Sequence, residues 1–365
     1  MKGYYIHFDH RRTIGVSKKI DMQLLSFSKK FDIQEINVIP KSKSLISRII
    51  WAMPFSYIIR DYDKFLSMID NPDFIYIRRS IADRKYIWFL STIKKKFPNC
   101  KMVVELYTYP YDKDEFLRKN TWIMYGKEVF YRRFYKKIID RFVVYTNDDY
   151  VFGVPTLKTR NGIDFSMYRV KKCINKTDEI RIISVAYLQK QHAYERVIEG
   201  LKNYYQNGGT RKIKYFIVGI GPELSKYKLM VEKYELKDNV IFTGQKTGEE
   251  LDELYDYCDI GAAFFGTYKT NIKVNSALKT REYLAKGLPM VYSGAVDVIN
   301  EEFPYKVIVP DNGNPVSMDE IIKLFDRIKN DRELIAKKIR YYGEQTVSMD
   351  KTMDIVYSFI SCNEF

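Results

Sequence analysis

Residues 276–289 read Ser-Ala-Leu-Lys-Thr-Arg-Glu-Tyr-Leu-Ala-Lys-Gly-Leu-Pro, and the apolar run Met290-Val291-Tyr292 follows them. Lys279 and Glu282 stand three residues apart, just under one helical turn, so a helix would carry both on one face. The Gly-x-Pro sequence at 287–289 predicts that this helix ends there, before a buried strand. This order is typical of α/β sheets, and it places both charges at a helix start, where phosphates and ribose hydroxyls are commonly held.

The rest of the chain alternates strand and helix signals, which is the pattern of a doubly wound α/β protein. Strands are expected at 3–8, 35–39, 74–77, 102–106 and 141–145, and again at 180–185, 214–218, 240–243, 260–264, 290–292 and 305–309. Because 365 residues exceed one ordinary domain, we expect an N-terminal Rossmann-like domain at 1–165 and a C-terminal one at 178–343. The unpatterned stretch 166–177 would link them, and the two sheets would face a central cleft.

Composition narrows the class of protein. No apolar run reaches membrane-spanning length, and the first residues lack the apolar core of a secretion signal, so we expect a cytoplasmic protein. Four cysteines without a Cys-x-x-Cys pair and three histidines indicate neither a disulfide framework nor a metal site. Residues 1–178 hold 35 Lys and Arg against 19 Asp and Glu, a net +16, whereas the remainder carries −1. One domain is therefore expected to meet an anionic partner.

Two glycine turns follow predicted strands. Gly219-Ile220-Gly221-Pro222 resembles the first half of a dinucleotide fingerprint, but Leu224 stands where the third glycine belongs, so a tight strand–helix turn is the alternative. Gly15-Val16-Ser17 opens the first predicted helix. A glycine there lets a ligand approach the free amides of the helix start, although Ser17 could simply cap an ordinary helix.

Taken together, these pieces resemble the family-four retaining glycosyltransferases, the group 1 enzymes of bacterial surface polysaccharide synthesis. The resemblance covers most of the chain and rests on motifs in the family's order. They are Gly15-Val16-Ser17, Asn161-Gly162-Ile163-Asp164, Ile183–His192, Ala193–Gly200, Val218–Pro222, Val240–Gly244, Leu254–Ile260 and Lys279–Pro289. The resemblance implies a GT-B fold, in which the C-terminal helix, here 344–365, crosses back toward the first domain.

The resemblance also implies roles at the predicted helix. Glu282 matches the second of two glutamates and would bind the donor's ribose hydroxyls, since a carboxylate can accept two hydrogen bonds from a vicinal diol. The first glutamate, which touches the donor sugar in the family, is replaced by Val274. Asn271, which lies outside the residues described below, Asn275 and the backbone amides of the loop Gly266–Leu278 are candidates to substitute for it.

Cations and strand-end loops would hold the rest of the donor. Lys279 is expected to be the main catalytic cation at the diphosphate, with His192 or Lys190 second. The run His192-Ala193-Tyr194-Glu195-Arg196 looks like a variant of the His-Gly-x-Asp-Arg sequence of capsule-type members. Further expected donor contacts are Gly15, Gly219, Gly221 and, near the base, Gln245.

The acceptor and sugar side is assigned to the first domain. Thr108 or Tyr109 would take the place of a histidine that the family often carries after the corresponding strand. His10 and Asn161 are further candidates. The segment 122–137 mixes aromatic and cationic residues at helical spacing. Such a face suits an anionic membrane surface, and a core helix with solvated charges is the alternative.

The sequence thus predicts a metal-independent glycosyltransferase of hexosyl or N-acetylhexosaminyl type that needs no cofactor. It would move a sugar, with retention, from a nucleotide-diphosphate donor to a lipid-linked saccharide for capsule, O-antigen or a similar polymer. Its partners would be the nucleotide sugar, the acceptor and the inner face of the membrane, and not nucleic acid. Two alternatives stay open: a non-catalytic GT-B subunit or glycan-binding partner, and a GT-B nucleotide-sugar epimerase.

Overall fold

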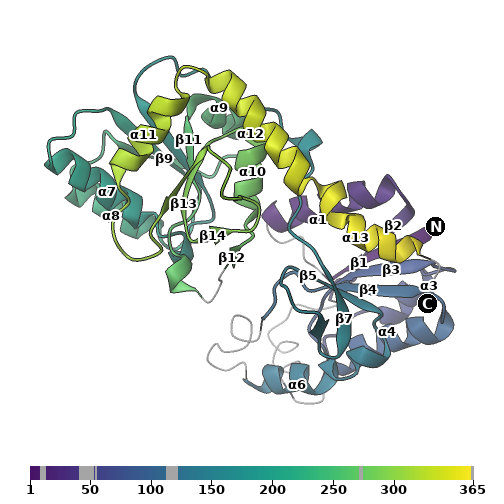
Figure 1. The fold of residues 1–365 in the computed structure, drawn as a ribbon. Helices are drawn as coiled ribbons and strands as arrows, with labels where there is room; N and C mark the ends of the chain where they lie inside the picture. Colours follow the sequence, from purple (N-terminus) through teal and green to yellow (C-terminus); the bar gives the residue numbers. More distant parts are fainter. Residues whose placement is uncertain (9–13, 41–52, 54–55, 112–121, 271–273, 363–365) are drawn as a thin grey trace. The chain divides into compact units, whose positions relative to one another are not determined.

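The computed structural model describes residues 1–8, 14–40, 53, 56–111, 122–270 and 274–362, without the side chains of Ile14, Trp122 and Ile123. The chain forms two compact units. Unit 1 comprises Met1–Asn161 together with Met349–Phe365, and unit 2 comprises Gly162–Ser348. In Figure 1, unit 1 runs from purple to teal and also holds the last yellow helix.

Unit 1 is built on a sheet of strand order β2-β1-β3-β4-β5-β7-β6, in which all neighbours are parallel except β6 and β7. Its strands are β1 (Lys2–His7), β2 (Asp32–Asn37), β3 (Phe74–Arg78), β4 (Lys101–Glu105), β5 (Arg141–Val144), β6 (Tyr150–Val151) and β7 (Val154–Lys158). Its helices are α1 (Ile14–Ser28), α3 (Tyr62–Ser67), α4 (Arg84–Lys96), α6 (Trp122–Arg132) and α13 (Met349–Ser361), and a 3-10 turn η1 (Tyr135–Lys137) follows α6. Every residue of β3 and β4 is buried, as expected for parallel strands covered on both faces.

The C-terminal helix α13 belongs to unit 1. Ser26 of α1 donates to Asp350 at 2.6 Å, and the ring of Tyr357 packs edge-on against Phe27 at 5.2 Å. Lys101 of β4 donates to the backbone carbonyls at the end of α13. The helix begins at Met349 rather than at 344, because α12 (Arg332–Val347) continues to Val347.

Unit 2 holds a fully parallel sheet of order β10-β9-β8-β11-β13-β15 and a small two-stranded sheet, β12-β14. Its strands are β8 (Ile180–Val185), β9 (Ile213–Val218), β10 (Val240–Gly244), β11 (Ile260–Ala262), β12 (Val274–Asn275), β13 (Met290–Ser293), β14 (Ala295–Val296) and β15 (Lys306–Val309). Its helices are α7 (Glu195–Gln206), α8 (Leu224–Lys233), α9 (Gly248–Tyr257), α10 (Leu278–Lys286), α11 (Met318–Ile328) and α12, with 3-10 turns η2 (Phe165–Met167), η3 (Lys190–His192) and η4 (Thr267–Lys269).

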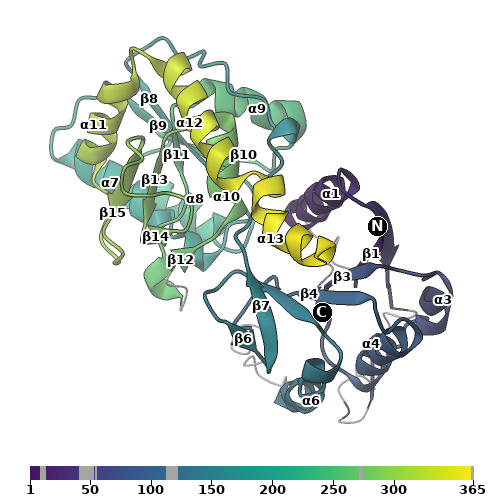
Figure 2. The same cartoon turned by 45° about the vertical axis from the view of Figure 1, so that its right-hand side comes forward.

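The strand order of unit 2 reverses direction between β8 and β11. Figures 1 and 2 show α7, α8 and α11 on one face of the sheet and α9, α10 and α12 on the other. This is the doubly wound arrangement, in which ligands bind beyond the carboxyl ends of the strands at the reversal point. The loops after β8 and β11 therefore lie where a ligand is expected.

The stretch expected to be a linker, 166–177, is instead folded into unit 2. Arg169 makes two hydrogen bonds to the Asp256 carboxylate, at 2.7 and 2.8 Å, and Asn175 donates to Asp259 at 2.7 Å. The chain passes between the units at Asn161–Gly162. The expectation of a linker was wrong because irregular backbone carries no periodicity, even where its side chains are firmly bound. None of the helices described here is both long enough and apolar enough to span a bilayer.

Candidate active site

The start of α10 is held in place by side chains that come from its own first turns, from the loop before it and from the residue that follows β14 (Ala295–Val296). Arg281 is fully buried and donates to Asp297 at 2.6 Å and to Ser276 at 3.0 Å. The Asn275 side chain accepts a hydrogen bond from the Ala277 amide at 2.8 Å. Asn275 therefore supports the loop ahead of the helix. The Thr280 amide already donates to the Ala277 carbonyl at 3.3 Å, whereas the amides of Leu278 and Lys279 precede the first intrahelical hydrogen bond. Such amides favour an anion.

Lys279, the second residue of α10, points to the loop after β8. Its Nζ donates to the hydroxyl of Tyr194 at 2.9 Å and lies 5.4 Å from the centre of that ring. Burial lowers the pKa of Lys279 to about 7, against the opposing effect of Glu282. A lysine with this pKa can gain a full charge when an anion binds beside it.

His192 stacks on Tyr194, the same ring that Lys279 contacts. Its ring lies 5.4 Å from that of Tyr194 with 15° between the planes, and its Nδ1 accepts a hydrogen bond from the Gln189 amide at 3.2 Å. Burial, and then the charge of Lys279, lower the pKa of His192 to about 2. In the absence of a bound anion the ring is therefore neutral, with its proton on Nε2 as a hydrogen-bond donor, and its role as a second cation at the diphosphate stays a prediction. Lys190 is exposed at the start of η3.

Glu282 lies one turn along α10 from Lys279. Its carboxylate accepts a hydrogen bond from the hydroxyl of Tyr168 at 3.0 Å. The structure thus brings Lys279, His192 and Glu282 to one end of the unit 2 sheet, through α10 and the loop after β8. Lysine, neutral histidine and carboxylate together can hold a diphosphate and a ribose.

Gly219 and Gly221 have φ values of 137° and 154°, which side chains rarely adopt. A Cβ at Gly219 would stand 1.8 Å from the Ala186 carbonyl oxygen, and one at Gly221 would stand 2.4 Å from that of Leu188. Both glycines are therefore required for the packing of one strand-end loop on another, which supports the tight-turn interpretation. Their contact with a donor stays a prediction, as does that of Gln245, which is exposed just after β10.

The remaining candidates belong to unit 1. Gly15 lies in the first turn of α1, with no atom within 4 Å of where a Cβ would stand. Asn161 accepts a hydrogen bond from Lys19 at 2.6 Å. Thr108 is exposed after β4, whereas Tyr109 packs against the ring of Phe152 at 6.0 Å. His10 lies outside the described residues.

Sequence reasoning missed three features of these sheet ends. The hydroxyls of Tyr194 and Tyr168 bind Lys279 and Glu282, respectively. The run 192–196 includes Tyr194 but assigns it no role, and Tyr168 lies in no motif. At the carboxyl ends of β3 and β4, Arg78 donates to Glu105 at 2.7 Å, and both side chains are buried. The signal for this ion pair was present, since two arginines directly follow the buried strand 74–77. A buried pair of this kind costs desolvation, so it points to a structural or binding role at that edge.

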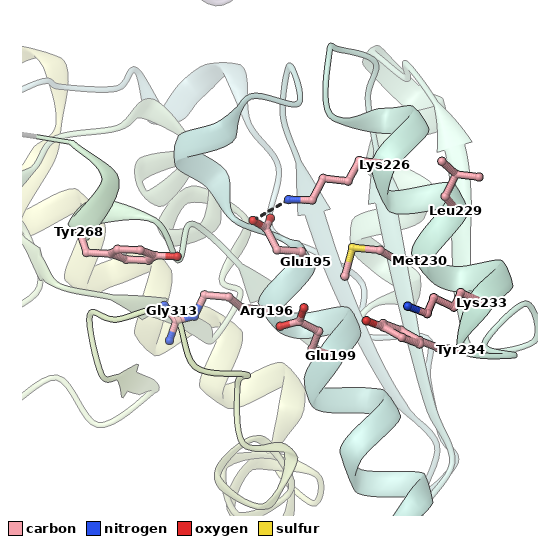
Figure 3. Close-up of a pocket in the computed structure, with 10 residues that line it drawn as sticks. All are labelled: Glu195, Arg196, Glu199, Lys226, Leu229, Met230, Lys233, Tyr234, Tyr268 and Gly313. Carbon is pink, nitrogen blue, oxygen red and sulfur yellow. Dashed lines mark hydrogen bonds and ion pairs between the residues drawn. The ribbon is translucent and has the colours of Figure 1, made fainter.

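A separate groove of about 540 Å³ lies between α7 and α8. Figure 3 shows Glu195 and Lys226 pointing toward one another across it, at 3.0 Å. It is lined by Glu195, Arg196, Glu199, Lys226, Leu229, Met230, Lys233, Tyr234, Tyr268 and Gly313. No predicted donor residue is among them. Within the described ranges, no group of three or more His, Cys, Asp or Glu side chains is arranged to hold a metal ion.

Two Rossmann-like units of this kind define the GT-B class of fold. Solved structures agree: HepE of Anabaena in complex with UDP-glucose aligns with 98% of this chain and 100% of its own at a TM-score of 0.64 and 12% identity. WaaG, a glycosyltransferase involved in lipopolysaccharide biosynthesis, aligns with 99% of this chain and 100% of its own at 0.59, again at 12% identity.

Residues 169–346 match the family described as glycosyl transferases group 1. The chain is 25% identical over 147 residues to a colanic acid biosynthesis glycosyltransferase of Escherichia coli, WcaL. The aligned segment covers 40% of this chain and 36% of that protein. It is 29% identical over 144 residues to the amylovoran biosynthesis glycosyltransferase AmsK of Erwinia amylovora, covering 39% and 35%. The matches thus span little more than a third of either relative.

Proposed function

We propose that this protein is a glycosyltransferase that moves a hexosyl or N-acetylhexosaminyl group from a nucleotide-diphosphate sugar to a saccharide acceptor in surface polysaccharide synthesis. The observation that carries the proposal is the convergence of Lys279, His192 and Glu282 at the start of α10. The names of the relatives, which belong to colanic acid and amylovoran biosynthesis, support the polymer class. UDP-glucose bound to the structurally similar HepE supports a nucleotide-sugar donor.

In this proposal each group has a distinct task. The α10 amides and the Lys279 cation neutralise the diphosphate as its bond to the sugar C1 breaks. Glu282 accepts hydrogen bonds from the ribose hydroxyls, and His192 donates its Nε2 proton in a neutral hydrogen bond. The acceptor oxygen forms the new bond to C1 on the face that the diphosphate leaves, and its proton passes to a diphosphate oxygen. The configuration is then retained without a protein nucleophile, a cofactor or a metal ion.

The acceptor would be lipid-linked and approached at the inner face of the membrane. Support comes from α6 and η1, where Val129 and Phe130 are exposed and Arg133 lies 4.1 Å from the Phe130 ring. Lys136 and Lys137 are exposed beside them, whereas Tyr135 is buried. One side of this segment thus packs in the core, and the other carries the aromatic and cationic mixture that suits anionic lipid.

A non-catalytic GT-B subunit is the second candidate. Val274 favours it, because this side chain is 51% exposed in β12 and provides no carboxylate at the position where the resembled family has one. Such a subunit would bind nucleotide and release no product.

The test is a transfer assay with radiolabelled UDP-, GDP- and ADP-sugars and membrane-extracted lipid-linked saccharides, run with and without EDTA. The proposal predicts labelled lipid, stoichiometric release of the nucleotide and no effect of EDTA. Tight nucleotide binding without turnover would replace it with the non-catalytic subunit. Conversion of the free nucleotide sugar without acceptor growth would indicate an epimerase.

A further inference from the structure

Tyr168 comes from the irregular stretch that precedes the sheet of unit 2, yet it reaches a predicted ligand-binding carboxylate. Its hydroxyl donates to Glu282 Oε1 at 3.0 Å. The two residues are 114 positions apart in the sequence. No motif of the chain links them, so the contact is created by the fold.

The backbone on both sides of Tyr168 is tied to the end of α10. Arg340 of α12 donates to the Tyr168 carbonyl at 2.7 Å and to the Ala285 carbonyl at 2.9 Å. It also donates to the Phe165 carbonyl at 2.8 Å and lies 4.7 Å from the Phe165 ring. One guanidinium thus joins the stretch that carries Tyr168 to the helix that carries Glu282.

Two further contacts fix the same stretch. The Lys171 amide donates to the Lys286 carbonyl, the last residue of α10, at 3.0 Å. The Asp164 carboxylate accepts hydrogen bonds from the Ser166 amide and hydroxyl at 2.9 and 2.7 Å. The backbone beside Tyr168 is therefore held before any ligand arrives, as a residue that orients another side chain requires.

The chemistry of the contact suits a positioning role. Burial, and then the charge of Glu282, raise the pKa of Tyr168 well above its usual value, so the hydroxyl stays protonated and can only donate to the carboxylate. A carboxylate has about four lone-pair sites, so Oε1 can accept a second hydrogen bond while Tyr168 occupies the first. The tyrosine donor therefore restricts the rotation of the carboxyl group.

We propose that Tyr168 is a positioning residue that orients Glu282 toward the vicinal hydroxyls of the donor ribose. This inference rests on the proposed function, since it needs a nucleotide at α10. Its specific consequence is that the tyrosine hydroxyl contributes to binding only when the ribose presents both of its hydroxyls.

The experiment is calorimetric titration of the full chain with UDP, GDP and ADP and with their 2′-deoxy and 3′-deoxy counterparts. In Tyr168→Phe, affinity for the bound ribonucleotide should fall about five- to tenfold, as expected for loss of a charge-assisted hydrogen bond. Affinity for the deoxy counterparts should fall less than twofold, so discrimination between ribose and deoxyribose shrinks. In a Glu282→Ala background, which lacks the acceptor of the Tyr168 hydroxyl, the Tyr168→Phe change should have no further effect.

The matched control is Tyr342→Phe. Tyr342 lies on α12 in the same unit, and its hydroxyl donates to the Val298 carbonyl at 2.8 Å. This variant therefore also loses one tyrosine hydroxyl, but one that does not bind Glu282. This variant should keep wild-type discrimination. Parallel loss of affinity for ribo- and deoxynucleotides in Tyr168→Phe, or no loss for either, would overturn the positioning role while leaving the proposed function intact. Failure of the wild type to bind any ribonucleotide would refute both.

Discussion

The buried Lys279 predicts that affinity for a nucleotide sugar falls as the pH rises through neutrality. A lysine is a cation only below its pKa, and burial sets that of Lys279 to about 7. If only the cation binds the diphosphate, about nine tenths of the sites are competent at pH 6 and about 3% at pH 8.5. The apparent dissociation constant should therefore rise about thirtyfold over this range, approaching tenfold per pH unit at its upper end.

The assay is calorimetric titration from pH 6 to 8.5 with a nucleotide sugar, whose diphosphate lacks the terminal phosphate ionisation near pH 6. Repeating it at pH 8 in buffers of different ionisation enthalpy should show uptake of nearly one proton on binding. His192, with its pKa at about 2, does not titrate in this window. Lys279→Arg keeps the charge at every pH and should flatten the profile. A flat profile in the wild type, or an equal slope in Lys279→Arg, would refute the reasoning.

Further expectations concern turnover, stability and membrane binding. Lys279→Ala should lower transfer at least about a hundredfold, because it removes the main cation at the leaving group, and near-normal turnover would contradict that assignment. Lys279→Met should raise the melting temperature by a few degrees at pH 7 and have no effect near pH 11. Burial lowers the pKa of Lys279 in the folded protein, so its charged form destabilises the fold at any pH below about 10.4, the pKa of a lysine in the unfolded chain. Asp297→Ala should cost on the order of 3 kcal/mol in urea unfolding, since it leaves the buried Arg281 without its carboxylate, and a loss below about 1 kcal/mol would dismiss that ion pair. Charge reversal at four cations of the segment 122–137 should abolish binding to vesicles of anionic lipid in a flotation assay; these are Arg132, Arg133, Lys136 and Lys137. Unchanged binding would favour the core-helix interpretation.

The strands and the α10 site could be predicted because their signals are local. Buried parallel strands are continuous apolar runs, so 74–77 stands out without any knowledge of the fold. The spacing of Lys279 and Glu282 likewise fixes their common helix face. The Gly-x-Pro sequence marks the end of α10, which the structure places at Lys286.

What the sequence could not predict depends on packing between distant segments. The neutral state of His192 follows from its stacking on Tyr194 beside Lys279, which becomes visible only in three dimensions. The stretch 166–177 looked like a linker because its partners, among them Asp256 and Asp259, lie more than 80 residues away. Irregular backbone with distant partners has no periodic signature.

Calorimetric titration of UDP-, GDP- and ADP-sugars into the wild type and two variants tests whether a nucleotide sugar binds at the start of α10. We predict that the wild type binds at least one of them and that Glu282→Ala weakens this binding at least about tenfold. Glu199→Ala, in the groove between α7 and α8, should leave it unchanged. No binding by the wild type, or loss of binding in Glu199→Ala but not in Glu282→Ala, would contradict the claim.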